Sequence, residues 1–301
     1  MRTAQSQSPH LTTNPITMKQ TLNTSNTLTP FNTSVQAHKE RVHFTDTALL
    51  NATNPIKVHL IGAGGTGSQV ATALARINHA LVALGHAGLS VTLWDNDLVS
   101  PANLGRQLFS ACELGMYKST ALISRINRFF GTDWRAQTQL FSTETFSSEE
   151  ETMRGSIYLS CVDSAKARFD IGEVLTHLER AHHYHNNPKY WLDFGNSTHS
   201  GQVILGTLQA IEQPYSDTFI PIDTLPTITQ AFGELLTQSE QNDNTPSCSL
   251  AEALTKQDLF INATLSQMGS SLLWNLFREG FTPYRGFFLN LKDFRTQPLL
   301  V

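Results

Sequence analysis

Apolar segments of strand and helix length alternate along the first half of the chain. A short apolar run at 57–61 enters a glycine-rich turn, which leads into an Ala- and Leu-rich segment at 68–84. A second apolar run, Leu89–Trp94, ends at an aspartate, and a further helical segment covers 119–130. A strand, a turn, a helix and a second strand in this order predict a βαβ unit with two parallel strands.

The alternation continues through the second half. Apolar runs predict strands at 134–141, 157–162, 190–194 and 202–208. Helices are predicted at 165–182 and 250–278, with a partly helical segment at 143–154. Residues 209–247 hold four prolines and predict an irregular loop, which in a compact domain is usually functional or mobile. The whole pattern predicts an α/β protein with a large sheet covered by helices.

The start of the chain has a different composition. Of its first 36 residues, 21 are Thr, Ser, Asn or Gln, and the only charged side chains are Arg2 and Lys19. Such a stretch buries too little apolar surface to offset the entropy lost on ordering. We therefore expect a flexible polar tail over 1–40 and one domain over 41–301.

Composition excludes several classes of function. Lys plus Arg number 21 and Asp plus Glu 25, so a net charge of −4 provides no basic field for nucleic acid. Three cysteines argue against a disulfide framework and for a reducing, cytoplasmic location. No apolar run reaches membrane-spanning length, and the start lacks the apolar core of an export signal, so we expect neither a membrane span nor export.

The turn after the first strand is GxGxxG, from Gly62 to Gly67. Gly62 allows a tight turn, Gly64 lets the backbone approach a phosphate, and Gly67 lets the helix pack close to the strand. The following helix N-terminus favours an anion. Asp95, at the end of the second strand, could accept hydrogen bonds from ribose hydroxyls. The alternatives are a purely structural glycine turn and a solvated acid.

Two cations follow this unit. Arg106 lies in Asn103-Leu104-Gly105-Arg106-Gln107, and Lys118 comes three residues after Gly115. Hydride transfer needs no such cations beyond the cofactor turn. Displacement at a nucleotide α-phosphate does, because negative charge accumulates on the non-bridging oxygens.

The motifs GxGxxG, DxDxV, NLxRQ and GxxK occur here in the order seen in the ThiF/MoeB/ubiquitin-activating enzyme superfamily, which the chain resembles. The resemblance continues into Cys161-Val162-Asp163-Ser164-Ala165-Lys166-Ala167-Arg168 and covers about 57–290. The endings of two later strands are most like the ThiF-like member of the bacterial PRTRC cassette. The resemblance implies a Rossmann-like, doubly wound mixed sheet with helices on both faces, and a crossover loop at about 209–248.

It also implies roles for individual residues. Those implied to bind MgATP are Gly62, Gly64, Gly65, Gly67, Asp95, Asp97, Asn103, Arg106, Gln107 and Lys118. Those implied for catalysis are Arg106, Lys118, Asp163 and Cys248. Asp163 would hold the Mg²⁺, although an acid there could instead cap the following helix. Asp97 could also cap the following turn through its own carboxylate.

Cys248 immediately precedes Ser249-Leu250-Ala251-Glu252, which fits the S-x-x-E capping box. A thiol at a helix N-terminus is favoured as thiolate. The superfamily uses a cysteine here for sulfur chemistry, but a buried apolar role is equally compatible with the sequence. Cys161 is expected in the core, and Cys112 in a loop.

Two departures from the superfamily are visible. The chain has no CxxC pair, so we expect no Cys₄ zinc site. The arginine segment that reaches a partner's ATP site is matched only loosely, by Arg41, so the expected homodimer has no clear trans-acting arginine. The histidines at 177, 182, 183 and 185 fit a solvated helix end better than a metal site.

The leading hypothesis is ATP-dependent adenylation of the C-terminal glycine of a ubiquitin-like protein, followed by transfer to a thiol or to a conjugating or sulfur-transfer partner. The alternatives are an NAD-dependent oxidoreductase, which leaves both cations and Asp163 unexplained, and a non-catalytic adaptor, which leaves the whole polar set unexplained.

Overall fold

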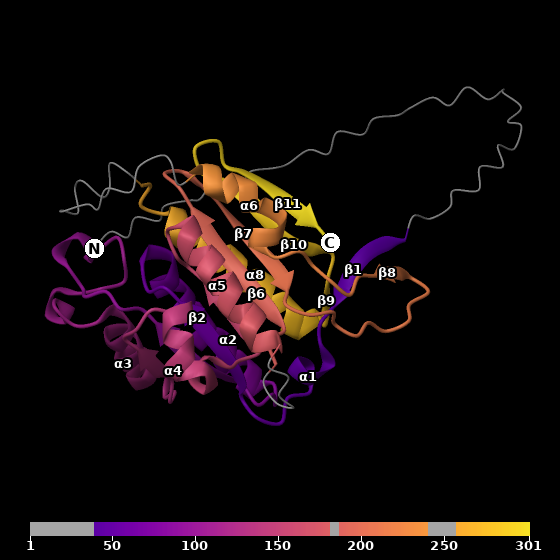
Figure 1. Cartoon of the computed structure of the whole chain (residues 1–301), viewed down its shortest axis with the longest axis horizontal. Helices are drawn as coiled ribbons and strands as arrows, with labels where there is room; N and C mark the ends of the chain where they lie inside the picture. The colour runs from indigo at the N-terminus through magenta and orange to yellow at the C-terminus, as the bar shows by residue number, and fades with distance from the viewer. Residues whose placement is uncertain (1–38, 181–186, 240–256) are drawn as a thin grey trace, which may run out of the picture. The chain divides into compact units, whose positions relative to one another are not determined.

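The computed structural model describes residues 39–180, 187–239 and 257–301. Its centre is an eight-stranded sheet in the order β11-β10-β7-β6-β5-β2-β3-β4 (Figure 1). The strands are β2 Ile56–Ile61, β3 Leu89–Trp94, β4 Arg135–Gln137, β5 Ile157–Ser160, β6 Tyr190–Asn196, β7 Ser200–Thr207, β10 Tyr284–Asn290 and β11 Arg295–Leu300. Strands β2 to β6 pair in parallel, whereas β7, β10 and β11 add antiparallel pairs at one side. The sheet is therefore mixed.

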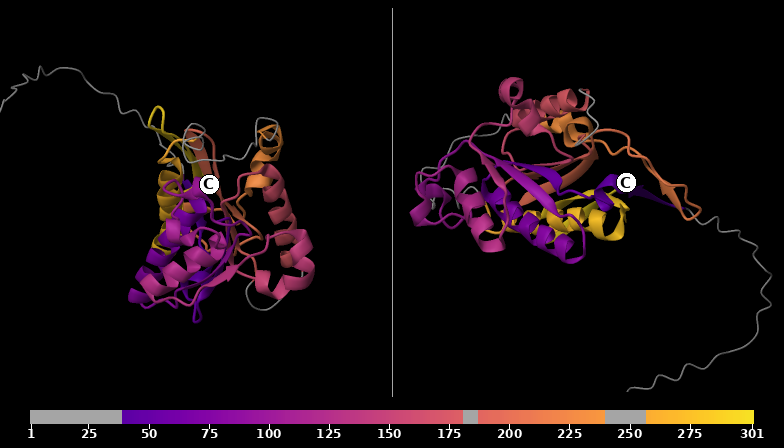
Figure 2. Two further views of the ribbon diagram at one scale, coloured as in Figure 1. Left: turned by 90° about the vertical axis from the view of Figure 1, so that its left-hand side faces the viewer. Right: turned by 90° about the horizontal axis from the view of Figure 1, so that it is seen from below.

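Helices cover both faces of this sheet (Figure 2). One layer holds α2 Gly65–Ala83, α3 Lys118–Phe130 and α8 Ile261–Glu279, and the other holds α4 Thr143–Met153, α5 Ala165–Arg180 and α6 Ile228–Ser239. A short helix, α1 Thr47–Leu50, precedes β2. The predicted doubly wound α/β fold is confirmed. No helix in the described parts of the chain is long and apolar enough to cross a membrane.

The surroundings of strand β2 explain why its sequence is apolar almost throughout. Val58 and Leu60 face the core under α2 and α8, and Ile61 faces the core under α5. A parallel strand in the middle of such a sheet is buried on both faces, so apolar and polar residues do not alternate along it. The carboxyl ends of β2, β3, β5 and β6 consequently meet at one edge of the sheet.

Three predicted elements differ from the structure. Strand β4 is shorter than the expected 134–141, because its partner β3 ends at Trp94 and offers no pairing beyond Gln137. The loop expected over 209–247 contains the short strand β8 Phe219–Pro221 and helix α6, whose Ile228 and Leu236 enter the core. Residues 257–260, expected to be helical, form a turn in which the Asp258 side chain accepts from the Phe260 N–H at 2.8 Å, and α8 begins at Ile261. The part of this prediction at 250–256 lies outside the described residues.

A second, three-stranded sheet joins distant parts of the chain. Strand β1 Glu40–Phe44 pairs in parallel with β8 and antiparallel with β9 Phe281–Thr282 (Figure 1). The buried His43 connects β1 to the main sheet, since its Nε2 lies 2.9 Å from the Tyr190 hydroxyl and its Nδ1 2.7 Å from the Ile222 carbonyl.

The buried His59 gives the fold a pH dependence. Its ring stacks on Tyr158, with centroids 5.2 Å apart, and its Nδ1 accepts from Trp94 Nε1 at 3.0 Å. Burial lowers the pKa of His59 to about 4. The unfolded chain therefore binds this proton near pH 6.5 and the folded chain only near pH 4, so the free energy of unfolding should fall by about 3 kcal/mol across that window.

Urea unfolding at pH 7.5 and at pH 4.5 tests this expectation. His59→Gln retains an acceptor for Trp94 and should flatten the dependence, whereas His79→Gln, at an exposed position, should leave it unchanged. If the free energy of unfolding falls equally between the two pH values in wild type and in His59→Gln, other groups cause the pH dependence.

Candidate functional site

The glycine turn occupies the junction between β2 and α2. Gly62 has a φ of 94°, which favours glycine, and its N–H donates to the Trp94 carbonyl at 2.9 Å. A Cβ on Gly67 would lie 1.9 Å from the Gly62 carbonyl oxygen, and one on Gly65 would lie 2.4 Å from Asn262 Nδ2. These three glycines are thus required by the packing of the chain on itself.

Gly64 differs from the other three. A Cβ added there would meet no protein atom within 4 Å, and its φ is −72°, so neither packing nor backbone strain requires glycine. Gly64 is the N-cap residue of α2 and provides no capping side chain. The first N–H groups of this helix are therefore not satisfied by a cap, an arrangement suited to an anion.

The Asp95 carboxylate organises the turn from the end of β3. One oxygen accepts from the Ala63 N–H at 2.6 Å, and the other accepts from the Asp97 N–H at 2.9 Å. Burial raises the pKa of Asp95 above its ordinary value, although nearby Lys118 and the two N–H donors oppose the rise. The side chain predicted to hold a ribose thus already bonds two backbone groups.

Lys118 and Asp97 form an ion pair. Lys118 Nζ lies 2.7 Å from Asp97 Oδ2, and the lysine side chain is 8% exposed whereas the aspartate is 65% exposed. A pair with one partner so open to solvent can be rearranged at modest cost. In the described structure the Asp97 carboxylate thus pairs with the lysine at the start of α3 rather than capping the following turn.

The loop between β3 and α3 positions the remaining predicted residues. Asn103 is buried, and its Oδ1 accepts from both the backbone N–H and the hydroxyl of Ser100, at 2.8 and 3.0 Å. Gln107 is also buried, and its Oε1 has no partner among the described residues. Asn103 thus shapes the loop, whereas the Gln107 acceptor is buried and unpaired within the described ranges.

Arg106 is linked to the glycine turn through two amide side chains. Its Nη1 donates to Gln257 Oε1 at 2.8 Å, and the same oxygen accepts from Asn262 Nδ2 at 2.9 Å. Asn262 Oδ1 accepts in turn from Thr66 Oγ1 at 2.9 Å and from Asn196 Nδ2 at 3.1 Å. Motif spacing does not reveal Asn262 or Gln257. The only sequence signal is a polar residue on the apolar face of α8.

The Arg106 guanidinium is half-buried, and burial lowers its pKa from the ordinary value. Its Nε is buried and has no hydrogen-bond partner in the described part of the chain. Its described partner is a neutral amide, so within these residues no carboxylate balances its charge. This cation is suited to an anionic ligand.

Arg168 and Asp193 form a buried ion pair behind the site. Arg168 Nε lies 2.9 Å from Asp193 Oδ1, and both side chains are at most 5% exposed. The guanidinium also donates to the carbonyls of Val162, Ser164 and Phe194 at 2.8, 3.1 and 3.0 Å. Arg168 thereby fixes the turn after β5 that presents the exposed Asp163. The sequence alone gave no reason to select Asp193.

The three cysteines have different surroundings. Cys161 lies under the glycine turn, and burial raises the pKa of its thiol well above the ordinary value. Cys112 is exposed, with its sulfur 3.1 Å from the Ser110 hydroxyl. Cys248 and its capping box lie outside the described residues, so its role remains a prediction from sequence.

The other expected features lie away from the glycine turn or outside the described residues. Arg41 is an exposed residue of β1. His177, on α5, stacks on Phe146 with centroids 5.7 Å apart, and the other three histidines of the cluster are outside the described residues. No group of three or more His, Cys, Asp or Glu positioned for a metal occurs in the described ranges.

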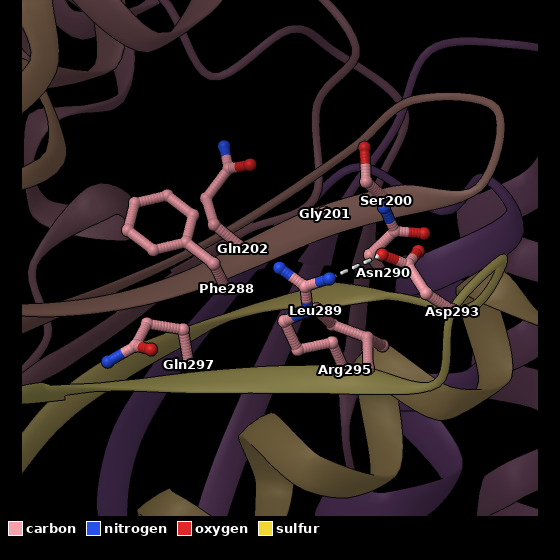
Figure 3. A pocket seen from close by; sticks show the side chains of 9 residues that line it. All are labelled: Ser200, Gly201, Gln202, Phe288, Leu289, Asn290, Asp293, Arg295 and Gln297. Carbon is pink, nitrogen blue, oxygen red and sulfur yellow. Dashed lines mark hydrogen bonds and ion pairs between the residues drawn. The ribbon is translucent and has the colours of Figure 1, made fainter.

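A shallow hollow of about 250 Å³ lies over strands β7, β10 and β11 (Figure 3). Figure 3 shows Gln202, Phe288 and Gln297 side by side on successive strands, with the Arg295–Asp293 ion pair, at 3.1 Å, at the other end. None of the residues predicted from sequence lines this hollow. It is therefore distinct from the glycine-turn site.

These features define the class of protein. It is an α/β protein with a mostly parallel sheet, in which a glycine turn, two acids and two cations follow the carboxyl ends of β2 and β3. The ThiF family matches residues 38–278, and the chain belongs to this family. No curated protein matches the sequence.

Two solved proteins share the fold. The crystal structure of selenomethionine PaaA gives a TM-score of 0.54 at 14% identity, covering 84% of this chain and 65% of PaaA. E. coli MccB with succinimide gives a TM-score of 0.52 at 13% identity, covering 83% of this chain and 64% of MccB. E. coli MccB with ATP gives a TM-score of 0.51 at 13% identity, with the same coverage of both chains. The chain thus spans slightly less than two thirds of the length of these proteins.

Proposed function

We propose that this protein is an adenylyltransferase that uses MgATP to activate a peptide or protein carboxylate. The observation that carries the proposal is the half-buried Arg106, held by the neutral Gln257 amide and connected through Asn262 to Thr66 in the first turn of α2. A cation with no described carboxylate partner, linked through two amide side chains to a helix whose N-cap Gly64 faces open space, suits a polyphosphate. Hydride transfer to or from NAD would require no such cation beyond the cofactor turn.

The chemistry is a displacement at the α-phosphate of ATP. The substrate carboxylate attacks phosphorus, the bond to the bridging oxygen breaks, and pyrophosphate leaves, giving an acyl-adenylate. Arg106 would stabilise the charge that develops on the phosphate oxygens, and Lys118 would join it once Asp97 turns toward solvent. Asp163, an exposed carboxylate at the end of β5, would hold Mg²⁺, which neutralises phosphate charge when bound.

Finer features of the proposal come from the resemblance. The substrate would be a ubiquitin-like protein ending in glycine, as in the superfamily that the chain resembles, and the protein would act as a cytoplasmic homodimer. Solved structures of E. coli MccB are of its complexes with ATP and with MccA, which supports a peptide or protein substrate here. The Cys248 thiol would attack the acyl-adenylate, forming a thioester and releasing AMP. A reductant-sensitive adduct that Cys248→Ala cannot form would identify this step.

ATP–pyrophosphate exchange tests the activity. We expect labelled pyrophosphate to enter ATP only when a peptide or protein with a free C-terminal carboxylate is added. The same molecule with an amidated C-terminus is the matched control. Equal exchange with both forms would refute carboxylate activation.

Substitutions at Gly64 and Gly67 distinguish contact with a ligand from packing within the protein. Gly64→Ala should change the free energy of unfolding by less than about 1 kcal/mol, since the added methyl group enters open space. It should weaken MgATP binding by about tenfold, since the methyl group enters the proposed phosphate position. Gly67→Ala should destabilise the fold by about 2 kcal/mol, because its Cβ meets the Gly62 carbonyl.

Chemical unfolding and calorimetric titration of both variants check this contrast. If Gly64→Ala binds MgATP with unchanged affinity, the glycine turn does not bind the phosphates.

A further inference from the structure

Gln257 holds an arginine without neutralising it. Its Oε1 accepts from Arg106 Nη1 at 2.8 Å and from Asn262 Nδ2 at 2.9 Å, so both hydrogen bonds use the carbonyl end of the amide. A carboxylate at this position could accept the same two bonds. The choice of an amide therefore concerns charge and not hydrogen-bonding capacity.

The amide is itself firmly held. Asn262 is 3% exposed, at the second position of α8, and its Oδ1 accepts from Thr66 and Asn196. The Asn262 side chain is buried, and its neighbours fix both its acceptor oxygen and one described donor contact. It therefore cannot rotate easily, and its Nδ2 gives Gln257 a defined orientation. Gln257 in turn determines where the Arg106 head group points.

Several other buried or half-buried cations of the domain have carboxylate partners. Arg168 pairs with Asp193, Arg125 with Glu113, and Lys118 with Asp97. A carboxylate beside a half-buried guanidinium satisfies its charge, so an incoming phosphate must compete for it. A neutral acceptor orients the guanidinium and leaves its charge available.

We propose that Gln257 is a positioning residue that aims Arg106 at the nucleotide phosphates through a neutral oxygen, with Asn262 transmitting the position of the glycine turn. The proposal rests on the proposed function and deepens it. Its distinguishing consequence concerns Gln257→Glu, which retains both hydrogen bonds and adds a charge. A merely structural residue would tolerate this change, whereas the proposed role would not.

Calorimetric titration with MgATP provides the test. Gln257→Glu should bind MgATP about tenfold or more weakly, with an unfolding midpoint no lower than that of wild type. Gln257→Ala, which loses the orientation but adds no charge, should bind about threefold to tenfold more weakly. The matched control is Gln267→Glu on α8, where the amide also accepts from an arginine, Arg76, at 3.4 Å, on the exposed surface. It should bind within about twofold of wild type.

The same titrations in an Arg106→Ala background complete the test. There Gln257→Glu should have no further effect beyond about twofold, because the charge it neutralises is gone. Wild-type affinity in Gln257→Glu, or an equal loss with and without Arg106, would overturn the positioning role. If Arg106→Ala itself binds MgATP as wild type does, the proposed function fails at this residue, and the positioning role fails with it.

Discussion

Arg106→Ala is expected to lower ATP–pyrophosphate exchange by roughly 10²- to 10³-fold, the range for removing one contact to developing transition-state charge. The reason is electrostatic: Arg106 is half-buried, its Nε has no partner among the residues that the structure describes, and its described partner is neutral. Its removal deletes positive charge that no described carboxylate balances. The free energy of unfolding should change little, since burial of an unbalanced guanidinium does not favour the folded state.

Exchange assays at saturating ATP, with chemical unfolding of the same samples, separate the two effects. Arg76→Ala is the matched control, because Arg76 also donates to a glutamine but lies on the exposed surface between α2 and α8. If Arg106→Ala exchanges pyrophosphate at a rate within a few-fold of wild type, Arg106 does not take part in the reaction.

The second large effect concerns stability. Arg168→Leu leaves the Asp193 carboxylate buried without its cation and removes three hydrogen bonds to carbonyls around β5 and β6. Removing one partner of a buried pair costs about 3 to 5 kcal/mol. We therefore expect a loss of this size in the free energy of unfolding, measured by urea denaturation.

The double variant Arg168→Leu with Asp193→Leu should be more stable than Arg168→Leu alone, because it leaves no unpaired buried charge. Arg295→Ala is the surface control. Its partner Asp293 is exposed, so the change should cost less than about 1 kcal/mol. A loss below 1 kcal/mol in Arg168→Leu would show that the pair does not hold the turn carrying Asp163.

Local sequence patterns predicted much of the fold. The strand Leu89–Trp94 has the bounds expected for it, and the glycine motif joins the predicted strand to the predicted helix, although α2 begins at Gly65 rather than Ser68. These features follow from burial on both faces of parallel strands and from backbone demands at Gly62 and Gly67, which are local properties. Strand β4 was overestimated because its length depends on where β3 ends, which is a tertiary property.

The candidate site was predicted less completely. Motif spacing selected Arg106 and Lys118, but it could not show that one has an amide partner and the other a carboxylate. The contacts of Gln257 with Arg106 and of Asn262 with Thr66 each join residues more than 150 positions apart, and the second depends on how α8 packs beside α2. No local pattern encodes such a contact.

The central claim is that the site binds MgATP through the glycine turn and Arg106. Calorimetric titration of MgATP and of NAD into wild type and Arg106→Ala tests it most directly. We predict saturable MgATP binding by wild type, at least tenfold weaker binding by Arg106→Ala, and far weaker binding of NAD. Tighter binding of NAD than of MgATP, or MgATP binding that is the same in both proteins, would contradict the claim.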